Sequence, residues 1–102
     1  MRTIEQGDII KTTIQGIQRY LLVVSCNTFN NRNGAVMVCP IMDKMYSRLS
    51  QRVKVGDEDG YVAFELVQLF DASQRAWTKV SRLEFVDIIE ASDTLQAIFD
   101  YV

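Results

Sequence analysis

Apolar residues before position 84 fall in short runs that are typical of β-strands. Such runs cover residues 9 to 14, 18 to 26, 35 to 42, 51 to 55 and 61 to 70, and residues 78 to 83 resemble a last strand. The run Tyr20-Leu21-Leu22-Val23-Val24 has no polar break, which predicts a strand buried on both faces. Residues 51 to 55 alternate basic side chains with valines and predict a half-exposed strand.

Turn-forming residues separate these runs. Gly7-Asp8 opens the first run, and the stretch from Gly56 to Gly60 reverses the chain after the fourth. The stretch NTFNNRNG, residues 27 to 34, predicts a loop, and Asn33-Gly34 at its end is a strong hairpin signal. Pro40, late in its run, implies that its missing N–H is not needed in a strand ladder.

From residue 84 to 102 the apolar period changes to that of a helix with one apolar face. The residues that form this face are Phe85, Ile88, Ile89, Leu95, Ile98, Phe99 and Val102. Glu84, Asp87 and Glu90 lie away from it, and early acids suit the positive end of a helix dipole. Because an acidic face is repelled by anionic lipid, we predict a helix that packs as a lid on the sheet.

These elements predict a mainly β protein, in which a small, strongly curved antiparallel sheet is closed by one C-terminal helix. The chain has 102 residues, 48% of them hydrophobic, so we expect a single domain over residues 1–102. No apolar run approaches the ~20 residues that a membrane helix needs, and no signal peptide is visible. We therefore expect a cytoplasmic protein that has no membrane partner.

The inventory of side chains limits the chemistry. The chain has no His, and its two cysteines, Cys26 and Cys39, are not in CxxC spacing. This argues against a zinc site and a Ser-His-Asp triad, so catalysis must use Arg, Lys, carboxylates or hydroxyls. We expect no cofactor and no metal, and we expect both cysteines to be reduced and buried on neighbouring strands.

Charge is divided unevenly along the chain, whose net charge is −2. Residues 83 to 102 carry five acids and no base, whereas residues 1 to 82 carry 11 bases and eight acids. The bases are densest in residues 43 to 55, at Lys44, Arg48, Arg52 and Lys54. They form either a solvated edge strand protected by charge or a surface for phosphates or an acidic peptide.

Arg19 stands directly in front of the buried run that begins at Tyr20. Its guanidinium is charged at every physiological pH. Two interpretations follow: an arginine at the rim of the sheet that pairs with Glu65 or Asp43, or a cation that is aimed at an anionic ligand.

The order of several short motifs resembles the MazF/PemK family of toxins. The motifs are GDII, G-x-x-R before an apolar strand that ends in VVS, N…GAVMVCPI, G-Y-V-A-F-E-L-V-x-x-x-D and a terminal amphipathic helix. The resemblance covers nearly the whole chain. It implies an SH3-like small barrel of the MazF/PemK/CcdB type, working as the growth-inhibiting toxin of a type II toxin–antitoxin system.

Members of this family are known as metal-independent endoribonucleases, or mRNA interferases, that cut single-stranded RNA. The resemblance therefore implies a hydrolase that binds single-stranded RNA, forms a homodimer and is inhibited by a cognate acidic antitoxin. Arg19 matches the main catalytic arginine, and Asn31 matches the Asn of the loop after the second strand. Glu65 and Asp71 match the acids of a later motif, and Gly7-Asp8 matches the opening GD.

The sequence departs from the family pattern in four places. Tyr20 replaces a Pro, Leu66 replaces a Gln, and the loop between the first two strands is short. Met42 replaces the Thr that is usually the second catalytic residue, and Asp43 follows it. The expected catalytic set is therefore Arg19, Asp43 and Glu65. The residues expected to bind RNA or the antitoxin are Lys44, Arg48, Arg52, Lys54 and Asn31.

Metal-free cleavage of RNA uses the 2′-hydroxyl of the substrate to attack the adjacent phosphorus. A base takes that proton, an acid protonates the leaving oxygen, and a cation holds the charge on the phosphate oxygens. Arg19 suits the last task, but Met42 neither donates nor accepts usefully, which leaves Asp43, Ser47, Glu65 and Thr28 as nearby candidates. Three functions stay open: a nuclease with a rebuilt site, a toxin that binds a protein as gyrase poisons do, and a binding module without catalysis.

Overall fold

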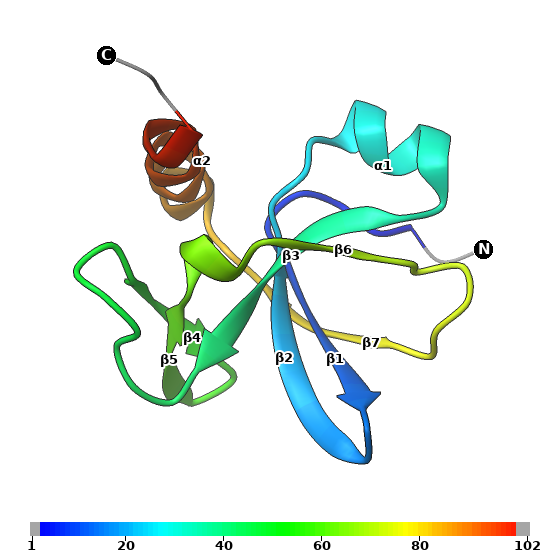
Figure 1. Ribbon diagram of the computed structural model, residues 1–102, viewed down its shortest axis with the longest axis horizontal. Helices are drawn as coiled ribbons and strands as arrows, with labels where there is room; N and C mark the ends of the chain where they lie inside the picture. The colour runs from blue at the N-terminus through cyan, green and yellow to red at the C-terminus, as the bar shows by residue number, and fades with distance from the viewer. Residues whose placement is uncertain (1–2, 100–102) are drawn as a thin grey trace.

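The predicted strands form one antiparallel sheet that curls strongly into a half-barrel (Figure 1). The computed structural model describes residues 3–99, apart from the side chain of Asn33. The strands are β1 (Asp8–Ile14), β2 (Ile17–Val23), β3 (Val36–Met42), β4 (Gln51–Val55), β5 (Glu58–Val62), β6 (Gln68–Phe70) and β7 (Thr78–Arg82). They follow the order β4-β5-β3-β2-β1-β7, and β6 pairs with the first half of β3. The mainly β class with a C-terminal helix, α2 (Phe85–Phe99), is confirmed.

The strand β2 lies between β1 and β3, and its last three residues, Leu21–Val23, are buried on both faces, as predicted. Leu22 packs with Cys39 in a core beneath α2, whereas Leu21 and Val23 pack in a second core on the opposite face. Successive side chains of a strand point to opposite faces, so one unbroken apolar run serves two cores. The turn before β2 is Gln15-Gly16, in which both residues have positive φ, 51° and 78°, as a type I′ turn requires.

The loop predicted for residues 27 to 34 is wrong, because Asn27–Asn33 form the short helix α1. Gly34 ends this helix with φ 63°, so the pair that resembles a hairpin signal is a helix C-cap. The buried Asn30 holds α1 in place by donating from its amide to the Ser25 carbonyl oxygen at 3.1 Å. Cys26 was expected on a strand but is exposed at the start of α1, because β2 has already ended at Val23.

The long strand predicted for residues 61 to 70 is also wrong, because the segment divides into β5, a 3₁₀ turn η1 (Phe64–Leu66) and β6. Both strands pair with β3, β5 at its end and β6 at its beginning. Pro40 offers only its carbonyl oxygen, which accepts the Ala63 N–H at 2.9 Å. The chain turns there and places Phe64 in the core, fully buried. Tertiary packing thus overrides a strand-like sequence.

The helix α2 packs on the sheet as predicted, but only part of its apolar face is covered. Ile88, Leu95 and Ile98 pack against the core around the buried Ala91. Phe85, Val86, Ile89 and Phe99 are exposed, and Val102 lies outside the described residues. Within residues 3–99, no helix is long and apolar enough to cross a membrane.

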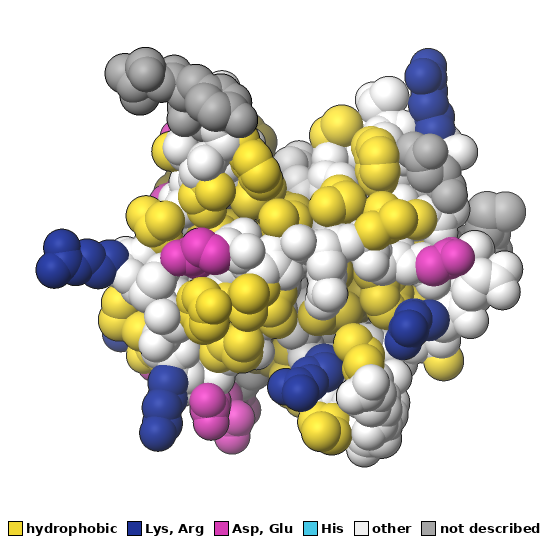
Figure 2. All heavy atoms as spheres, in the orientation of Figure 1, with side chains coloured by type: hydrophobic (Ala, Val, Ile, Leu, Met, Phe, Trp, Pro, Cys, Tyr) yellow, Lys and Arg dark blue, Asp and Glu magenta, His cyan; other side chains and the backbone are white. Residues whose placement is uncertain are grey.

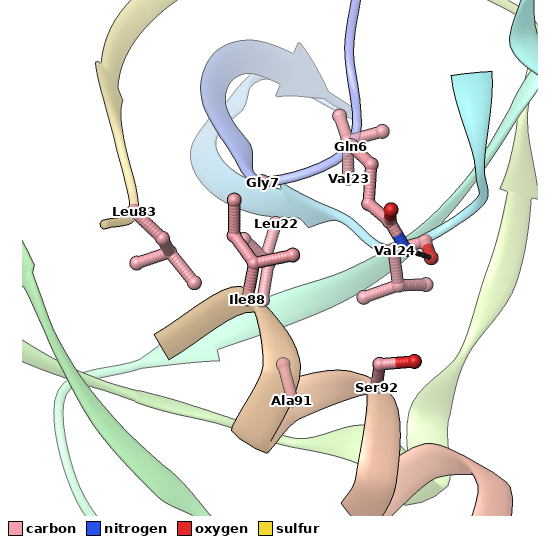
Figure 3. A pocket seen from close by; sticks show the side chains of 9 residues that line it. All are labelled: Gln6, Gly7, Leu22, Val23, Val24, Leu83, Ile88, Ala91 and Ser92. Carbon is pink, nitrogen blue, oxygen red and sulfur yellow. Dashed lines mark hydrogen bonds between the residues drawn. The ribbon is translucent and has the colours of Figure 1, made fainter. Parts of the chain in front are cut away.

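Gly7 faces Ile88 in the first turn of α2 (Figure 3). Its φ is +93°, and a Cβ built on it would stand 2.4 Å from Ile88 Cδ1. Its backbone also joins two strands, because its N–H donates to the Val23 carbonyl oxygen and its carbonyl oxygen accepts the Leu83 N–H. Gly7 therefore sets the depth at which α2 sits.

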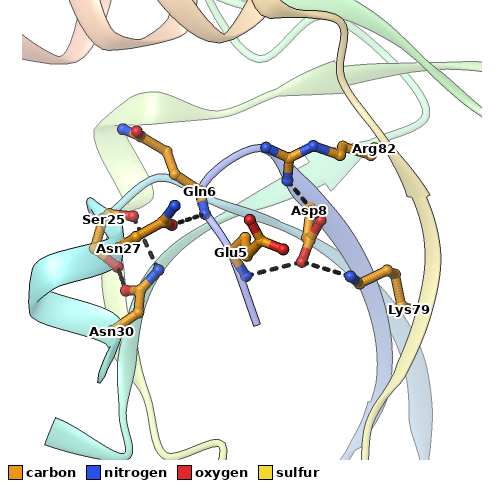
Figure 4. A network of polar contacts seen from close by, with 8 residues as sticks. All are labelled: Glu5, Gln6, Asp8, Ser25, Asn27, Asn30, Lys79 and Arg82. Carbon is orange, nitrogen blue, oxygen red and sulfur yellow. Dashed lines mark hydrogen bonds and ion pairs between the residues drawn. The ribbon is translucent and has the colours of Figure 1, made fainter. Parts of the chain in front are cut away.

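Asp8 is fully buried and anchors β7 to β1 (Figure 4). Arg82 Nη1 lies 2.9 Å from one carboxylate oxygen, and Lys79 Nζ lies 3.1 Å from the other. The backbone N–H of Glu5 donates to the same carboxylate at 2.8 Å. A buried charge must be paired to be tolerated, so this part of the GD motif has a structural role.

Candidate functional site

Arg19 is exposed on β2, opposite Thr12 of β1. Because side chains alternate along a strand, Arg19 lies on the same face of the sheet as Leu21, and Leu22 lies on the opposite face. No carboxylate within residues 3–99 forms an ion pair with it, so the predicted alternatives of pairing with Glu65 or Asp43 are not formed. Its guanidinium is open to solvent and to an anionic ligand.

Glu65 is exposed in η1, where its carboxylate accepts a hydrogen bond from the hydroxyl of Ser47. Burial, and after it the negative charge of Glu65, raises the pKa of the Cys39 thiol to about 12. No ion pair joins Arg19 and Glu65, and the carboxylate of Glu65 is bonded to Ser47 instead.

Met42 and Asp43 lie at the end of β3 that is nearest to Arg19. Tyr20↔Ile41 is the last pair of the β2–β3 ladder, so Arg19 and Met42 are the residues that adjoin this pair on their strands, and Asp43 is exposed just beyond. Asp43 lines a hollow of about 170 Å³ together with Glu58 and Asp59. Three carboxylates repel phosphate, so RNA is expected to approach Asp43 with a hydroxyl group and not with a phosphate.

The loop between β3 and β4, residues 43 to 50, is held in one shape by serine side chains. Ser50 Oγ accepts the N–H groups of Tyr46 and Ser47 at 3.1 and 3.2 Å, and Ser47 Oγ accepts the Leu49 N–H at 3.1 Å. The loop exposes Met45, Tyr46 and Leu49 next to the predicted binding residues Lys44 and Arg48. Sequence analysis found the bases and missed the apolar side chains, whose exposure only the fold reveals.

The other predicted binding residues are dispersed. Lys54 is paired with Asp59 at 2.8 Å, and this hydrogen bond lowers the pKa of the Asp59 carboxyl group. Arg52 is exposed opposite Tyr61 of β5. Asn31, on α1, lies at the end of the molecule away from the β4–β5 hairpin (Figure 1). The five residues therefore do not form one patch.

The elements that surround Arg19 define a class of fold: a half-barrel antiparallel sheet closed by a C-terminal helix. A chain of a MazE–MazF crystal structure from Deinococcus radiodurans is similar to this chain, with a TM-score of 0.84, 16% identity and 100% coverage of both chains. MazF alone from the same organism gives a TM-score of 0.76 at 17% identity, covering 96% of this chain and 97% of that one. An endoribonuclease in complex with its cognate antitoxin from a mycobacterial species gives a TM-score of 0.79 at 13% identity, covering 95% of this chain and 93% of that one.

At these identities the solved structures establish the fold. No curated protein matches the sequence. The family of PemK-like, MazF-like toxins of type II toxin–antitoxin systems has a model that matches residues 5–99, and the chain belongs to this family. The family resemblance and the fold class inferred from the sequence are both confirmed.

Proposed function

We propose that this chain is the growth-inhibiting toxin of a type II toxin–antitoxin system and cuts single-stranded RNA, chiefly messenger RNA, without a metal ion. Family membership supports the toxin, and one observation supports cleavage: Arg19 is exposed and has no carboxylate partner within residues 3–99. The planar fork of an unpaired guanidinium matches two phosphate oxygens. In this proposal residues 1–102 act as one domain in the cytoplasm.

The proposed reaction is an attack of the ribose 2′-oxygen on the adjacent phosphorus. A new 2′-O–P bond forms, the bond from phosphorus to the 5′-oxygen breaks, and a 2′,3′-cyclic phosphate and a 5′-hydroxyl remain. Arg19 stabilises the charge that builds on the phosphate oxygens. We assign the 2′-proton to the exposed carboxylate of Asp43, one residue beyond Met42, and the leaving oxygen takes its proton from solvent.

Glu65 has a different role in this proposal. It forms no ion pair with Arg19, and it accepts a hydrogen bond from Ser47. Ser47 lies in the loop that begins at Asp43. We therefore propose that Glu65 positions this loop, and that it acts on the reaction through Asp43.

The test is an RNA cleavage assay on the purified chain and its Arg19 variants. Arg19→Ala should lower the cleavage rate about 10²–10³-fold, as the loss of a preorganised donor to a charged transition state does. Arg19→Lys should not restore the rate, because a lysine is a point charge without the fork. Arg32→Ala removes an exposed arginine from α1 and is the matched control. Equal rates for Arg19→Ala and Arg32→Ala would contradict the assignment.

Met42→Thr separates a diverged nuclease from a module that only binds. This variant restores the hydroxyl of the family pattern beside Arg19, and cleavage should rise in it. If neither the wild-type chain nor Met42→Thr cuts RNA, the alternative holds, and the chain binds RNA or a protein target, as gyrase poisons do, without cleavage. This alternative is supported by Met42 itself, because its bulky apolar side chain occupies the position of the catalytic hydroxyl in the family pattern.

Two partners complete the proposal. The solved relatives include complexes with MazE or a cognate antitoxin, so we propose an acidic antitoxin for this chain. The loop of residues 43 to 50 offers it bases and apolar side chains together. We also propose a homodimer, because α2 leaves large apolar side chains uncovered.

A further inference from the structure

Two hollows adjoin the β6–β7 loop, one beside the β1–β2 hairpin and the other beside α1. These elements lie away from α2 (Figure 1). The first hollow has about 340 Å³ and is lined by Lys11, Thr12, Thr13 and Gln18 on one side and by Arg75 and Thr78 on the other. The second has about 390 Å³, and Asn31 and Ser73 line it. Trp77 lines both hollows, so they share a wall. We call the two together the Trp77 groove.

The charge of the Trp77 groove is one-sided. Lys11 and Arg75 line its first hollow, and no acid is among the described residues that line either hollow. Arg19 adjoins the first hollow, because it is opposite Thr12 and next to Gln18. A groove with cations and without acids attracts a phosphate chain. The second hollow has no charged lining residue, and the exposed amide of Asn31 there can donate and accept hydrogen bonds.

The walls of the groove are fixed before any ligand arrives. Thr12 Oγ1 donates to the Ala76 carbonyl oxygen at 2.7 Å, which ties the β6–β7 loop to β1. Trp77 Nε1 donates to the Ala72 carbonyl oxygen at 3.0 Å and holds the indole ring in the second core. Strand β7 pairs with β1 only as far as Lys11. From Thr12 onward, the edge of β1 that faces away from β2 has no strand paired with it. A preorganised groove binds without the entropic cost of ordering.

We propose that the Trp77 groove is the path of the single-stranded RNA beyond the bond that is cut. In this inference, which rests on the proposed function, Lys11 and Arg75 bind phosphates next to the one held by Arg19. The hollow at Asn31 receives a base, whose edge the Asn31 amide contacts. The cations supply affinity for any sequence, and Asn31 supplies preference among bases.

The experiment uses the full chain and a 2′-O-methyl oligoribonucleotide, which binds but has no 2′-hydroxyl to react. Binding is followed by oligonucleotide anisotropy and by the fluorescence of Trp77, the single tryptophan of the chain. Lys11→Gln and Arg75→Gln should each weaken binding to every sequence and lower the slope of log K against log salt by about 0.7. Asn31→Ala should change the base preference and leave the salt slope unchanged. Arg32→Gln, which removes an exposed charge outside the groove, is the control.

The outcomes separate this inference from the proposed function. If the chain cuts RNA, but Lys11→Gln and Arg75→Gln bind as Arg32→Gln does, the groove is not the RNA path and the nuclease stands. If the chain neither binds the oligonucleotide nor cuts RNA, both proposals fail. If poly-glutamate changes the Trp77 emission and the oligonucleotide does not, the groove belongs to an acidic protein partner and the RNA assignment is overturned.

Discussion

Gly7 is the residue at which the helix and the sheet are fitted most closely. A Cβ there would meet Ile88 Cδ1 at 2.4 Å, and the φ of +93° is unfavourable for any other residue. Gly7→Ala therefore combines backbone strain with overpacking, and overpacking alone typically costs about 1–3 kcal/mol. We predict that urea unfolding will show a free energy of unfolding for Gly7→Ala that is lower than that of the wild type by this amount or more.

Gly16→Ala is the matched control for that change. Gly16 also has a positive φ, +78°, but nothing lies within 4 Å of the Cβ that it would gain. This variant carries the backbone strain alone, so it should be destabilised less than Gly7→Ala. Equal losses in the two variants would show that the seat of α2 tolerates the extra methyl group.

Cys39 makes stability depend on pH at the alkaline end. Its thiol pKa is about 12 in the folded chain, raised from 9.0 by burial and then by Glu65. The unfolded chain loses this proton at lower pH than the folded chain. The contribution of the thiol to the free energy of unfolding is therefore fully present below pH 9 and is lost as the pH rises from 9 to 12. We predict that the stability difference between wild type and Cys39→Ala, measured by urea unfolding, shrinks across this window.

The exposed thiol of Cys26 supplies the comparison for Cys39. Cys26→Ala removes this exposed thiol and is unfolded under the same conditions, as the control for the loss of a cysteine. A pH-independent difference between wild type and Cys39→Ala would mean that the Cys39 thiol ionises equally in the folded and the unfolded chain.

At the scale of the element, the loop of residues 43 to 50 and the adjoining β4 carry the bases that we assign to the antitoxin. Arg48 and Arg52 are both exposed and have no ion pair within residues 3–99. Reversing both charges to Glu should weaken binding of an acidic antitoxin peptide, and added salt should reduce the difference because exposed charges are screened. Fluorescence anisotropy at low and high salt measures it, with Arg32→Glu as control. Binding that is unchanged at low salt would mean that these bases are only solvated.

At the scale of the whole molecule, several large apolar side chains of α2 and of η1 are left exposed. Figure 2 shows hydrophobic side chains gathered over α2 and over the neighbouring end of the sheet. Phe85 is 75% exposed and Val86 is 71% exposed, while Leu66 and Ile89 add to the same type of surface. Exposed apolar patches of this kind mark sites of association. We predict a homodimer with a mass near twice 11.7 kDa in light scattering.

Charges placed on α2 test this assembly. Phe85→Glu combined with Val86→Glu should give a monomer with an unchanged circular dichroism spectrum, because both side chains are exposed in the single chain. Gln96→Glu adds a charge to another exposed position of the same helix and should leave the dimer intact. A monomeric mass for the wild type across a concentration series would refute the dimer.

The sequence by itself determined the elements whose pattern is local. The unbroken run at Leu21–Val23 specified a central strand, and the spacing of Ile88, Leu95 and Ile98 specified a helix that packs on the sheet. The order of motifs also identified the family. This order is still recognisable although the chain is only 16% identical to a solved structure of the same fold. These inferences succeeded since each rests on the period of side chains along one element.

The tertiary structure alone decided where turn-like and strand-like segments went. Asn33-Gly34 caps a helix because the buried Asn30 is held by Ser25, and residues 61 to 70 bend because both halves pair with one strand. The candidate site depended on the same kind of information. Only the fold shows that Glu65 is bonded to Ser47 and not to Arg19, and that Met42 directly follows the last residue of β3 that pairs with β2. Contacts between residues that are distant in the chain leave no pattern in the local sequence, so they could be identified only in the folded structure.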